Sequence, residues 1–291
     1  MLLLVMAAVH LQDRQSPAEQ LASKMRRADL VSRMQVNLAS ASEAEKNAVM
    51  AAADDSKAFA DQARAASAEV ERGYRELDGL LKSSDMPGER TLLEQFAQSF
   101  GEFRRIDSEL LTLATKNSNL KAYGLAFGPA AHAMGEMHDA LSGLIAAKGK
   151  SAEAAKISLL AFRAQTSALR IQALLAPHIA EEREEKMDLL EASMGKEEAQ
   201  VHQALDALKA IPRLSDDKDL SSAVASYDRF SKLKTEIIAL SRENTNVRSL
   251  AISLHQKRKV TLICQETLSA LKQAILDEPI RGVTKRPVSP R

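Results

Sequence analysis

The stretch Asn117-Ser118-Asn119-Leu120-Lys121 occurs twice in the chain, because Asn244-Thr245-Asn246-Val247-Arg248 repeats its pattern. The flanking residues correspond at the same offset, so that Ala140-Leu141-Ser142 matches Thr267-Leu268-Ser269 without a gap. Apolar positions before the repeat also correspond: Phe103 with Phe230, Ile106 with Leu233, Leu110 with Ile237, and Leu113 with Leu240. We interpret this correspondence as an internal duplication that places polar residues in the middle of two apolar helical patterns.

The composition favours packed helices. Apolar residues make up 45% of the 291 residues and charged residues 27%, while aromatic residues reach only 3% and tryptophan is absent. Close helix packing favours small and aliphatic side chains, whereas strands are rich in aromatic and β-branched residues. The formal net charge of +1 supplies no overall field to attract nucleic acid.

Heptad patterns fill most of the chain. Ser16-Pro17-Ala18-Glu19 is a capping box with proline at the first helical position, which predicts a helix start. From there no stop appears until Lys82-Ser83-Ser84-Asp85-Met86-Pro87-Gly88, and between Leu38 and Leu80 residues alternate at spacings of four and three. Similar patterns predict three further helices over about residues 90–147, 151–210 and 216–276.

Four helices of about 60 residues, joined by short turns, predict an all-α fold. We expect an elongated up-down-up-down four-helix bundle, with the duplication in its second and fourth helices and a length of about 90 Å. Pro129 and Pro177 fall inside the second and third helices, where proline predicts a kink.

The two chain ends differ from the bundle, which we expect over residues 16–277. Residues 1–15 begin with the apolar run Met1–Val9, which is shorter than the roughly 20 residues that span a bilayer. We interpret this run as a partial membrane anchor. Residues 278–291 are basic and contain three prolines, and they predict a disordered tail.

Antiparallel packing would bring both asparagine strings to one height, midway along the bundle. Ser56 and His178 would lie at that height on the first and third helices, and Lys121 and Arg248 about one turn away. In one interpretation Asn117 and Asn244 form a polar layer that fixes the helix register. In the other, the amides, with Lys121 or Arg248 reaching inward, line a pocket for a small anionic or zwitterionic ligand. The sequence leaves both interpretations open.

Other chemistries have weaker support. His132 and His138 are six residues apart and do not share a helix face, so we expect no metal site and no cofactor. Lys257-Arg258-Lys259 lacks interleaved aromatic residues, and we expect no nucleic-acid binding. No arrangement of nucleophile and base is visible, so a catalytic site is not expected. The single cysteine, Cys264, lies on an apolar stripe and is expected to be a packed thiol.

Three stretches carry a family resemblance: Ser32-Arg33-Met34-Gln35, then Ala41-Ser-Glu-Ala-Glu-Lys-Asn-Ala-Val-Met50, and Asn117-Ser-Asn-Leu-Lys-Ala-Tyr-Gly-Leu-Ala-Phe-Gly-Pro129. They resemble the helical-bundle sensor (ligand-binding) regions of bacterial methyl-accepting chemotaxis receptors, and the likeness extends over about residues 20–276. The resemblance implies a homodimer with both bundle ends at the membrane, located in the periplasm. It also implies sensing of organic acids or amino acids and transmission by a helix displacement.

These observations predict a non-enzymatic, chemoreceptor-like sensory bundle. A small ligand would bind between helices and bias two close helix packings. The chain would be membrane-anchored with the bundle in the periplasm, or cytoplasmic if the N-terminal segment is not an anchor. The alternative is a structural or adaptor bundle without a ligand, whose polar layer only fixes helix register.

Overall fold

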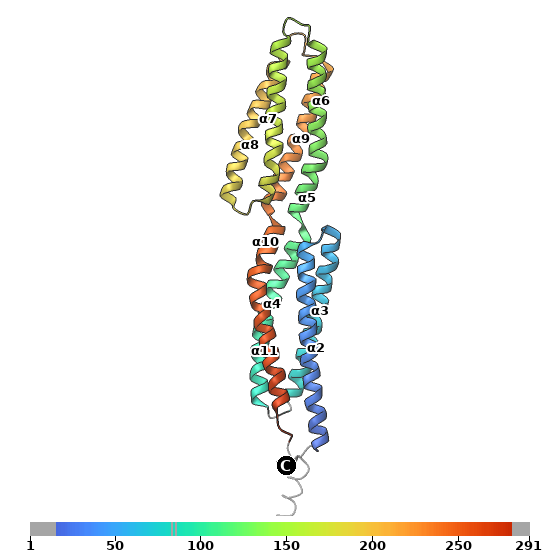
Figure 1. The fold of residues 1–291 in the computed structure, drawn as a ribbon, viewed down its shortest axis with the longest axis vertical. Coiled ribbons are helices and arrows are strands. Elements are labelled where there is room, and N and C mark those ends of the chain that lie inside the picture. The colour runs from blue at the N-terminus through green and yellow to red at the C-terminus, as the bar shows by residue number, and fades with distance from the viewer. Residues whose placement is uncertain (1–15, 83, 85, 281–291) are drawn as a thin grey trace, which may run out of the picture. The chain divides into compact units, whose positions relative to one another are not determined.

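The computed structural model describes residues 16–280 with the exception of residues 83 and 85. Within this part every regular element is helical, which confirms the predicted all-α class. The helices are α2 (Pro17–Met50), α3 (Ala53–Lys82), α4 (Pro87–Lys116), α5 (Ser118–Leu125), α6 (Ala131–Lys148), α7 (Ala154–Ala180), α8 (Glu184–Lys209), α9 (Lys218–Glu243), α10 (Thr245–Ile252) and α11 (Arg258–Asp277), with π-helical turns η1 (Ala126–Ala130) and η2 (Ser253–Lys257) (Figure 1). The predicted anchor and most of the predicted tail lie outside the described residues.

The chain divides into two compact units. We call residues 1–111 together with 252–291 the terminal unit, because it contains both chain ends. Residues 112–251 form the central unit, which is continuous in sequence. The division falls inside α4 and inside α10, so neither boundary coincides with a turn.

Helices α2, α3 and α11 and most of α4 share the core of the terminal unit. The capping box at Ser16 is present and confirms the predicted start of α2. The heptad stripes bury large aliphatic and aromatic side chains between the helices, as such stripes do. The core includes Met34 and Leu38 from α2, Val70 and Leu77 from α3, Phe96, Phe100 and Phe103 from α4, and Cys264, Leu268 and Leu271 from α11. The burial of Cys264 confirms the predicted packed thiol.

Helices α6, α7, α8 and α9, with α5 and η1, share the core of the central unit (Figure 1). Asp217 caps α9 by accepting hydrogen bonds from the backbone N–H groups of Asp219 and Leu220. The core residues include Met137 and Leu141 from α6, Ile171 and Leu175 from α7, Val201 and Leu205 from α8, and Tyr227 and Phe230 from α9.

The prediction of one unbroken first helix from Ser16 to Lys82 is wrong. The chain reverses at Ala51–Ala52, and α2 and α3 pack side by side as an antiparallel pair (Figure 1). Alanine favours helix, so this turn carries no local stop signal. The reversal instead buries the apolar stripes of α2 and α3 against each other, and Ser56 supports the turn by donating a hydrogen bond to the Ala48 carbonyl at 2.7 Å.

The predicted third helix also reverses, at Glu181–Arg183, to give the pair α7 and α8. Pro177 therefore lies in the last turn of α7 instead of kinking a longer helix. The two reversals replace the first and third predicted helices, of about 60 residues each, with two pairs of helices of which the longest, α2, has 34 residues. Four-helix packing is retained, but within each unit separately.

The predicted irregularity at Pro129 takes the form of the π-turn η1. A second π-turn, η2, occupies the corresponding position in the second copy of the repeat, where no proline is present. A π-turn accommodates one extra residue in a helix and often marks a functional position. Proline is therefore not required for this departure from α-helical geometry. None of the helices within residues 16–280 is both long enough and apolar enough to span a membrane.

Candidate functional site: a polar layer and an interhelical groove

Both asparagine strings interrupt a helix. Asn117, between α4 and α5, has φ 52° and ψ 40°, and Asn244, between α9 and α10, has φ 50° and ψ 38°. Both conformations are left-handed, and these two are the positive-φ residues other than glycine within the described residues. Asparagine tolerates this conformation better than most side chains do, because its short amide can bond locally. The residue type therefore permits two matched interruptions.

The two copies of the repeat cap each other's helix starts. The Ser118 N–H donates to Thr245 Oγ1 at 3.0 Å, and the Thr245 N–H donates to Ser118 Oγ at 3.1 Å. One residue later, the Asn119 N–H donates to Asn246 Oδ1 at 3.2 Å, and the Asn246 N–H donates to Asn119 Oδ1 at 3.1 Å. The first N–H groups of a helix have no partner inside it, so this exchange satisfies the starts of α5 and α10 together.

The side-chain amides extend the exchange to α7. Asn246 Nδ2 donates to Asn117 Oδ1 at 2.8 Å, and Asn119 Nδ2 donates to Asn244 Oδ1, also at 2.8 Å. Asn119 Nδ2 also donates to the Ile179 carbonyl at 2.7 Å, and Asn244 Nδ2 to the Glu181 carbonyl at 3.0 Å. These carbonyls lie at the end of α7, where helix geometry leaves them without intrahelical partners. We call Asn117, Ser118, Asn119, Asn244, Thr245 and Asn246 the polar layer.

His178 connects this end of α7 to α8 and α9. The Ser241 hydroxyl donates to the His178 carbonyl at 3.0 Å, and its oxygen lies 2.8 Å from the ring Nδ1. The ring Nε2 lies 2.8 Å from Glu191 Oε1, which also accepts from Arg242 Nε at 2.7 Å. Burial opposes ionisation of Glu191, but the hydrogen bonds from Arg242 and His178 outweigh it and lower the pKa of this carboxyl group.

The structure gathers only part of the predicted site. Asn117 and Asn244 lie in the polar layer, and His178 adjoins it through the end of α7. The side chains of Lys121 and Arg248 are exposed to solvent, so neither brings its charge into the layer. Ser56 belongs to the terminal unit, where its hydroxyl supports the turn between α2 and α3.

Several residues of this region were not predicted as site residues. Most hydrogen bonds between the two strings come from Ser118, Asn119, Thr245 and Asn246. Each of these residues belongs to the repeated string that is visible in the sequence. Residues at equivalent positions of the two copies bond to each other, so the repeat itself was the sequence feature that could have predicted this pairing. The roles of Ser241 and Glu191 had no comparable signal, because both sit in ordinary helical patterns.

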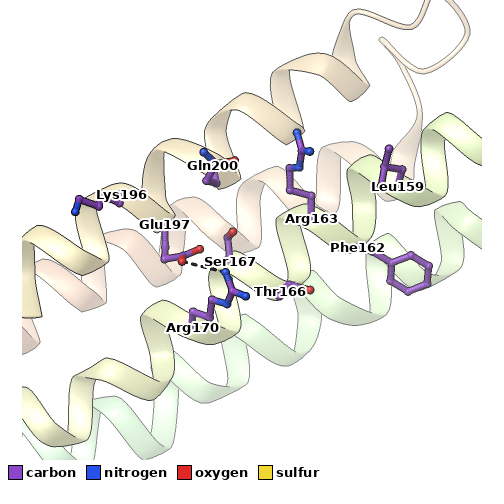
Figure 2. Close-up of a pocket in the computed structure, with 9 residues that line it drawn as sticks. All are labelled: Leu159, Phe162, Arg163, Thr166, Ser167, Arg170, Lys196, Glu197 and Gln200. Atoms are coloured by element: carbon purple, nitrogen blue, oxygen red, sulfur yellow. Dashed lines mark hydrogen bonds and ion pairs between the residues drawn. The ribbon is translucent and has the colours of Figure 1, made fainter.

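A separate groove of about 550 Å³ lies between α7 and α8 in the central unit (Figure 2). It is lined by Leu159, Phe162, Arg163, Thr166, Ser167 and Arg170 from α7 and by Lys196, Glu197 and Gln200 from α8. The spacing of three and four residues places these side chains on the facing sides of the two helices. The sequence predicted none of them, since a mixed polar face on a helix usually only meets solvent.

The groove has an excess of positive charge. Arg170 pairs with Glu197 Oε1 at 3.2 Å, and Figure 2 shows this pair beside Ser167. Arg163 and Lys196 form no ion pair with any other described residue. Glu197 Oε2 is buried and has no hydrogen-bond partner in the described part of the chain. The groove therefore offers two unpaired cations, one unsatisfied acceptor and the apolar side chains of Leu159 and Phe162.

Comparison with curated proteins finds no match for this sequence. A family model described as a four helix bundle sensory module for signal transduction matches residues 39–162. The matched range extends from the C-terminal part of α2 to the first turns of α7 and contains the first copy of the repeated string. No group of three or more metal-binding side chains is present between residues 16 and 280. The four-helix bundle sensory module of methyl-accepting chemotaxis receptors thus matches residues 39–162 of this chain, as the resemblance implied.

Proposed function

We propose that this chain is a sensory domain that binds a small anionic or zwitterionic ligand in the α7–α8 groove and transmits a helix shift through the polar layer. The observation that carries the proposal is the groove, with its unpaired Arg163 and Lys196 beside the unsatisfied Glu197 Oε2. The planar guanidinium of Arg163 suits a carboxylate, which can accept two parallel hydrogen bonds from it. A donor such as an ammonium or hydroxyl group would complete the hydrogen bonding of Glu197.

The same helix links the groove to the polar layer. α7 lines one side of the groove, and the carbonyls of His178, Ile179 and Glu181 at its end accept hydrogen bonds from Ser241, Asn119 and Asn244. A ligand that changes the packing of α7 on α8 acts on a helix whose end is tied to α5 and α9. Only a ligand that binds one packing more tightly than the other can shift the balance between them.

The competing function is a structural bundle without a ligand. Its support is that the polar layer satisfies most of its own hydrogen bonds, as expected of residues that fix register. Both functions let the layer fix the register, but only the sensory function places a ligand in the groove and has the layer transmit a helix shift. We therefore interpret the layer as the part that defines the resting register, and the groove as the ligand site.

Three further features are part of this proposal. The order α2, α3, α4, α5, η1, α6 recurs as α7, α8, α9, α10, η2, α11, which supports an origin by duplication of the whole domain and not only of its second and fourth predicted helices. The match to the receptor module supports a membrane-anchored homodimer with this domain in the periplasm. The domain would have no catalytic activity and no cofactor of its own.

A thermal-shift screen of organic acids, amino acids and metal ions tests the ligand site. A ligand at about 100 times its Kd should stabilise the domain by about 2.7 kcal/mol and raise its melting temperature. Arg163→Gln should abolish the shift, because it removes the carboxylate-binding group. Arg213→Gln, at an exposed position outside the groove, is the matched control and should keep the full shift. If organic acids and amino acids leave the melting temperature unchanged, or Arg163→Gln responds like the wild type, the groove is not the ligand site.

Transmission needs a separate test. Once a stabilising compound is known, hydrogen exchange should show that it changes the protection of the α5 and α10 backbone as well as that of α7 and α8. Replacing Asn119 and Asn246 together by leucine should preserve the binding but uncouple the change in α5 and α10. A variant that binds and still transmits the change would leave the layer with a purely structural role.

A further inference from the structure

The terminal unit encloses a cluster of charged side chains that the proposed function does not use. Glu45 from α2 is 1% exposed, Asp107 from α4 is 5% exposed and Lys257 from η2 is 1% exposed. Charged groups at such depth are costly unless each has a partner. The partners of each group therefore show which of the three charges is not compensated.

Lys257 and Asp107 satisfy each other. Lys257 Nζ donates a short hydrogen bond to Asp107 Oδ1, and it also contacts the Phe103 carbonyl at 3.3 Å. The ammonium group lies over the Phe103 ring, 3.1 Å from its centroid, which adds a cation–π interaction. The Lys257 ammonium group therefore interacts with Asp107 and with the Phe103 ring, and the Lys257–Asp107 pair has no net charge.

Glu45 is the member of the cluster without a charged partner of its own. Its carboxyl group has a hydrogen bond with Ser253, but its Oε1 is buried without a partner. Ser42 lies one turn earlier on α2, and its hydroxyl oxygen is also buried without a partner. An ionised Glu45 would add a net negative charge to the cluster and leave a carboxylate oxygen unsatisfied. A protonated Glu45 would leave the cluster neutral and gain an O–H donor.

We propose that Glu45 is a proton-binding site, and that loss of its proton as the pH rises weakens the contact of α2 with η2 and α4. This inference goes beyond the ligand site, since it concerns the other unit of the chain. Because η2 is a π-turn that supplies both Ser253 and Lys257, its geometry depends on the groups that hold these two side chains. The terminal unit would then respond to pH in addition to any ligand.

The charges around Glu45 support this assignment. Burial raises the pKa of Glu45, and the repulsion from Asp107 adds to this effect, while Ser253, Lys257 and Lys46 oppose it without reversing it. On the other two helices, Lys57 and Asp61 of α3 and Arg258 and Lys259 at the start of α11 are exposed.

The direction of the pH effect follows from this raised pKa. The folded terminal unit binds the proton of Glu45 more tightly than the unfolded chain does. The stabilisation is therefore fully present below the pKa of Glu45 in the unfolded chain, and it is lost as the pH rises through the higher pKa of the folded state. The melting temperature should fall over that window.

The experiment compares Glu45→Gln with Glu43→Gln, an exposed glutamate on the same helix. Glutamine imitates a protonated glutamate, so Glu45→Gln should match the wild type at the acidic end of a pH series and show a smaller fall in melting temperature as the pH rises. Glu43→Gln should keep the fall. Infrared spectra of the wild type, recorded over a series of rising pH, should also show the carbonyl band of a protonated carboxyl group that persists to higher pH than an ordinary glutamate allows. Glu45→Gln should lose this persistent band.

Burial raises the pKa of Glu89 as well, so a Glu89→Gln sample identifies its share of the infrared band. The inference is overturned if, once the share of Glu89 is subtracted, the protonated-carboxyl band of the wild type disappears over the pH range of ordinary glutamates. It is equally overturned if Glu45→Gln retains the wild-type fall in melting temperature. Arg163→Gln should leave both readouts unchanged, so failure of this inference can be told apart from failure of the groove.

Discussion

Asparagine at positions 117 and 244 combines two properties at one residue. It accepts a left-handed backbone conformation, and its side-chain oxygen accepts a hydrogen bond from the other copy of the repeat. Glycine would supply the first property and glutamine the second. The sequence showed that asparagine recurs at this point, but asparagine is also common at polar seam positions of straight helices. The sign of φ could therefore not be predicted from the residue type.

Substitutions at Asn117 separate these two properties. Asn117→Ala loses the amide and also places a Cβ-bearing residue without local side-chain bonding in the left-handed region. Asn117→Gly loses the amide alone. We expect Asn117→Ala to reduce the free energy of unfolding by about 1 kcal/mol more than Asn117→Gly does, as measured by urea denaturation. Equal losses would show that the backbone conformation at this position relaxes.

The reciprocal bonds between Asn119 and Asn246 predict energetic coupling. In a double-mutant cycle, Asn119→Ala and Asn246→Ala should show an interaction free energy of about 0.5–3 kcal/mol. Each side chain accepts from the backbone N–H of the other residue, so loss of one bond loosens the helix start that presents the other. Gln203→Ala, at an exposed position on α8, is the control and should be additive with Asn119→Ala. Additive losses for the asparagine pair would mean that the two strings are capped independently.

Among the elements, the paired helices were the hardest to predict. The heptad pattern located the apolar stripes of α2 and α3 correctly, and Asp54 and Asp55 supplied a helix-start signal that was visible in the sequence. The reversal at Ala51–Ala52 was missed because local preference there is helical and tertiary packing overrides it. The reversal at Glu181–Arg183 was missed for the same reason, since its stabilising bonds come from Asn244 and Asn119.

Two glycines within α3 test how closely it packs against α2. A Cβ added at Gly73 would lie 2.7 Å from Met34 Cγ, whereas a Cβ at Gly79 would meet nothing within 4 Å. Alanine is favoured over glycine inside a helix by about 1 kcal/mol. We therefore expect Gly79→Ala to raise the melting temperature and Gly73→Ala to lower it, because the buried Met34 must move. A rise for both variants would show that the α2–α3 interface is loosely packed.

At the scale of the whole molecule, each compact unit is completed by a helix from the other half of the sequence. α6 ends the first half and contributes Met137 and Leu141 to the central unit, whereas α11 ends the second half and contributes Leu268 and Leu271 to the terminal unit. The repeat and the helical patterns were readable from the sequence. The assignment of α6 and α11 to these units was not, because it depends on two reversals that carry no local helix-stop signal.

This assignment predicts how the chain can be divided. Residues 112–251 contain every helix of the central unit, so this segment expressed alone should unfold in one cooperative thermal transition, followed by circular dichroism.

Residues 16–149 correspond to the first half of the apparent duplication, but they lack α11 and its buried side chains Val260, Cys264, Leu268, Leu271 and Ile275. Each such loss costs about 2–5 kcal/mol where a large side chain is removed, against a total stability of about 5–15 kcal/mol. This segment should therefore show no cooperative transition. Cooperative unfolding of residues 16–149, with none for residues 112–251, would contradict the division into units.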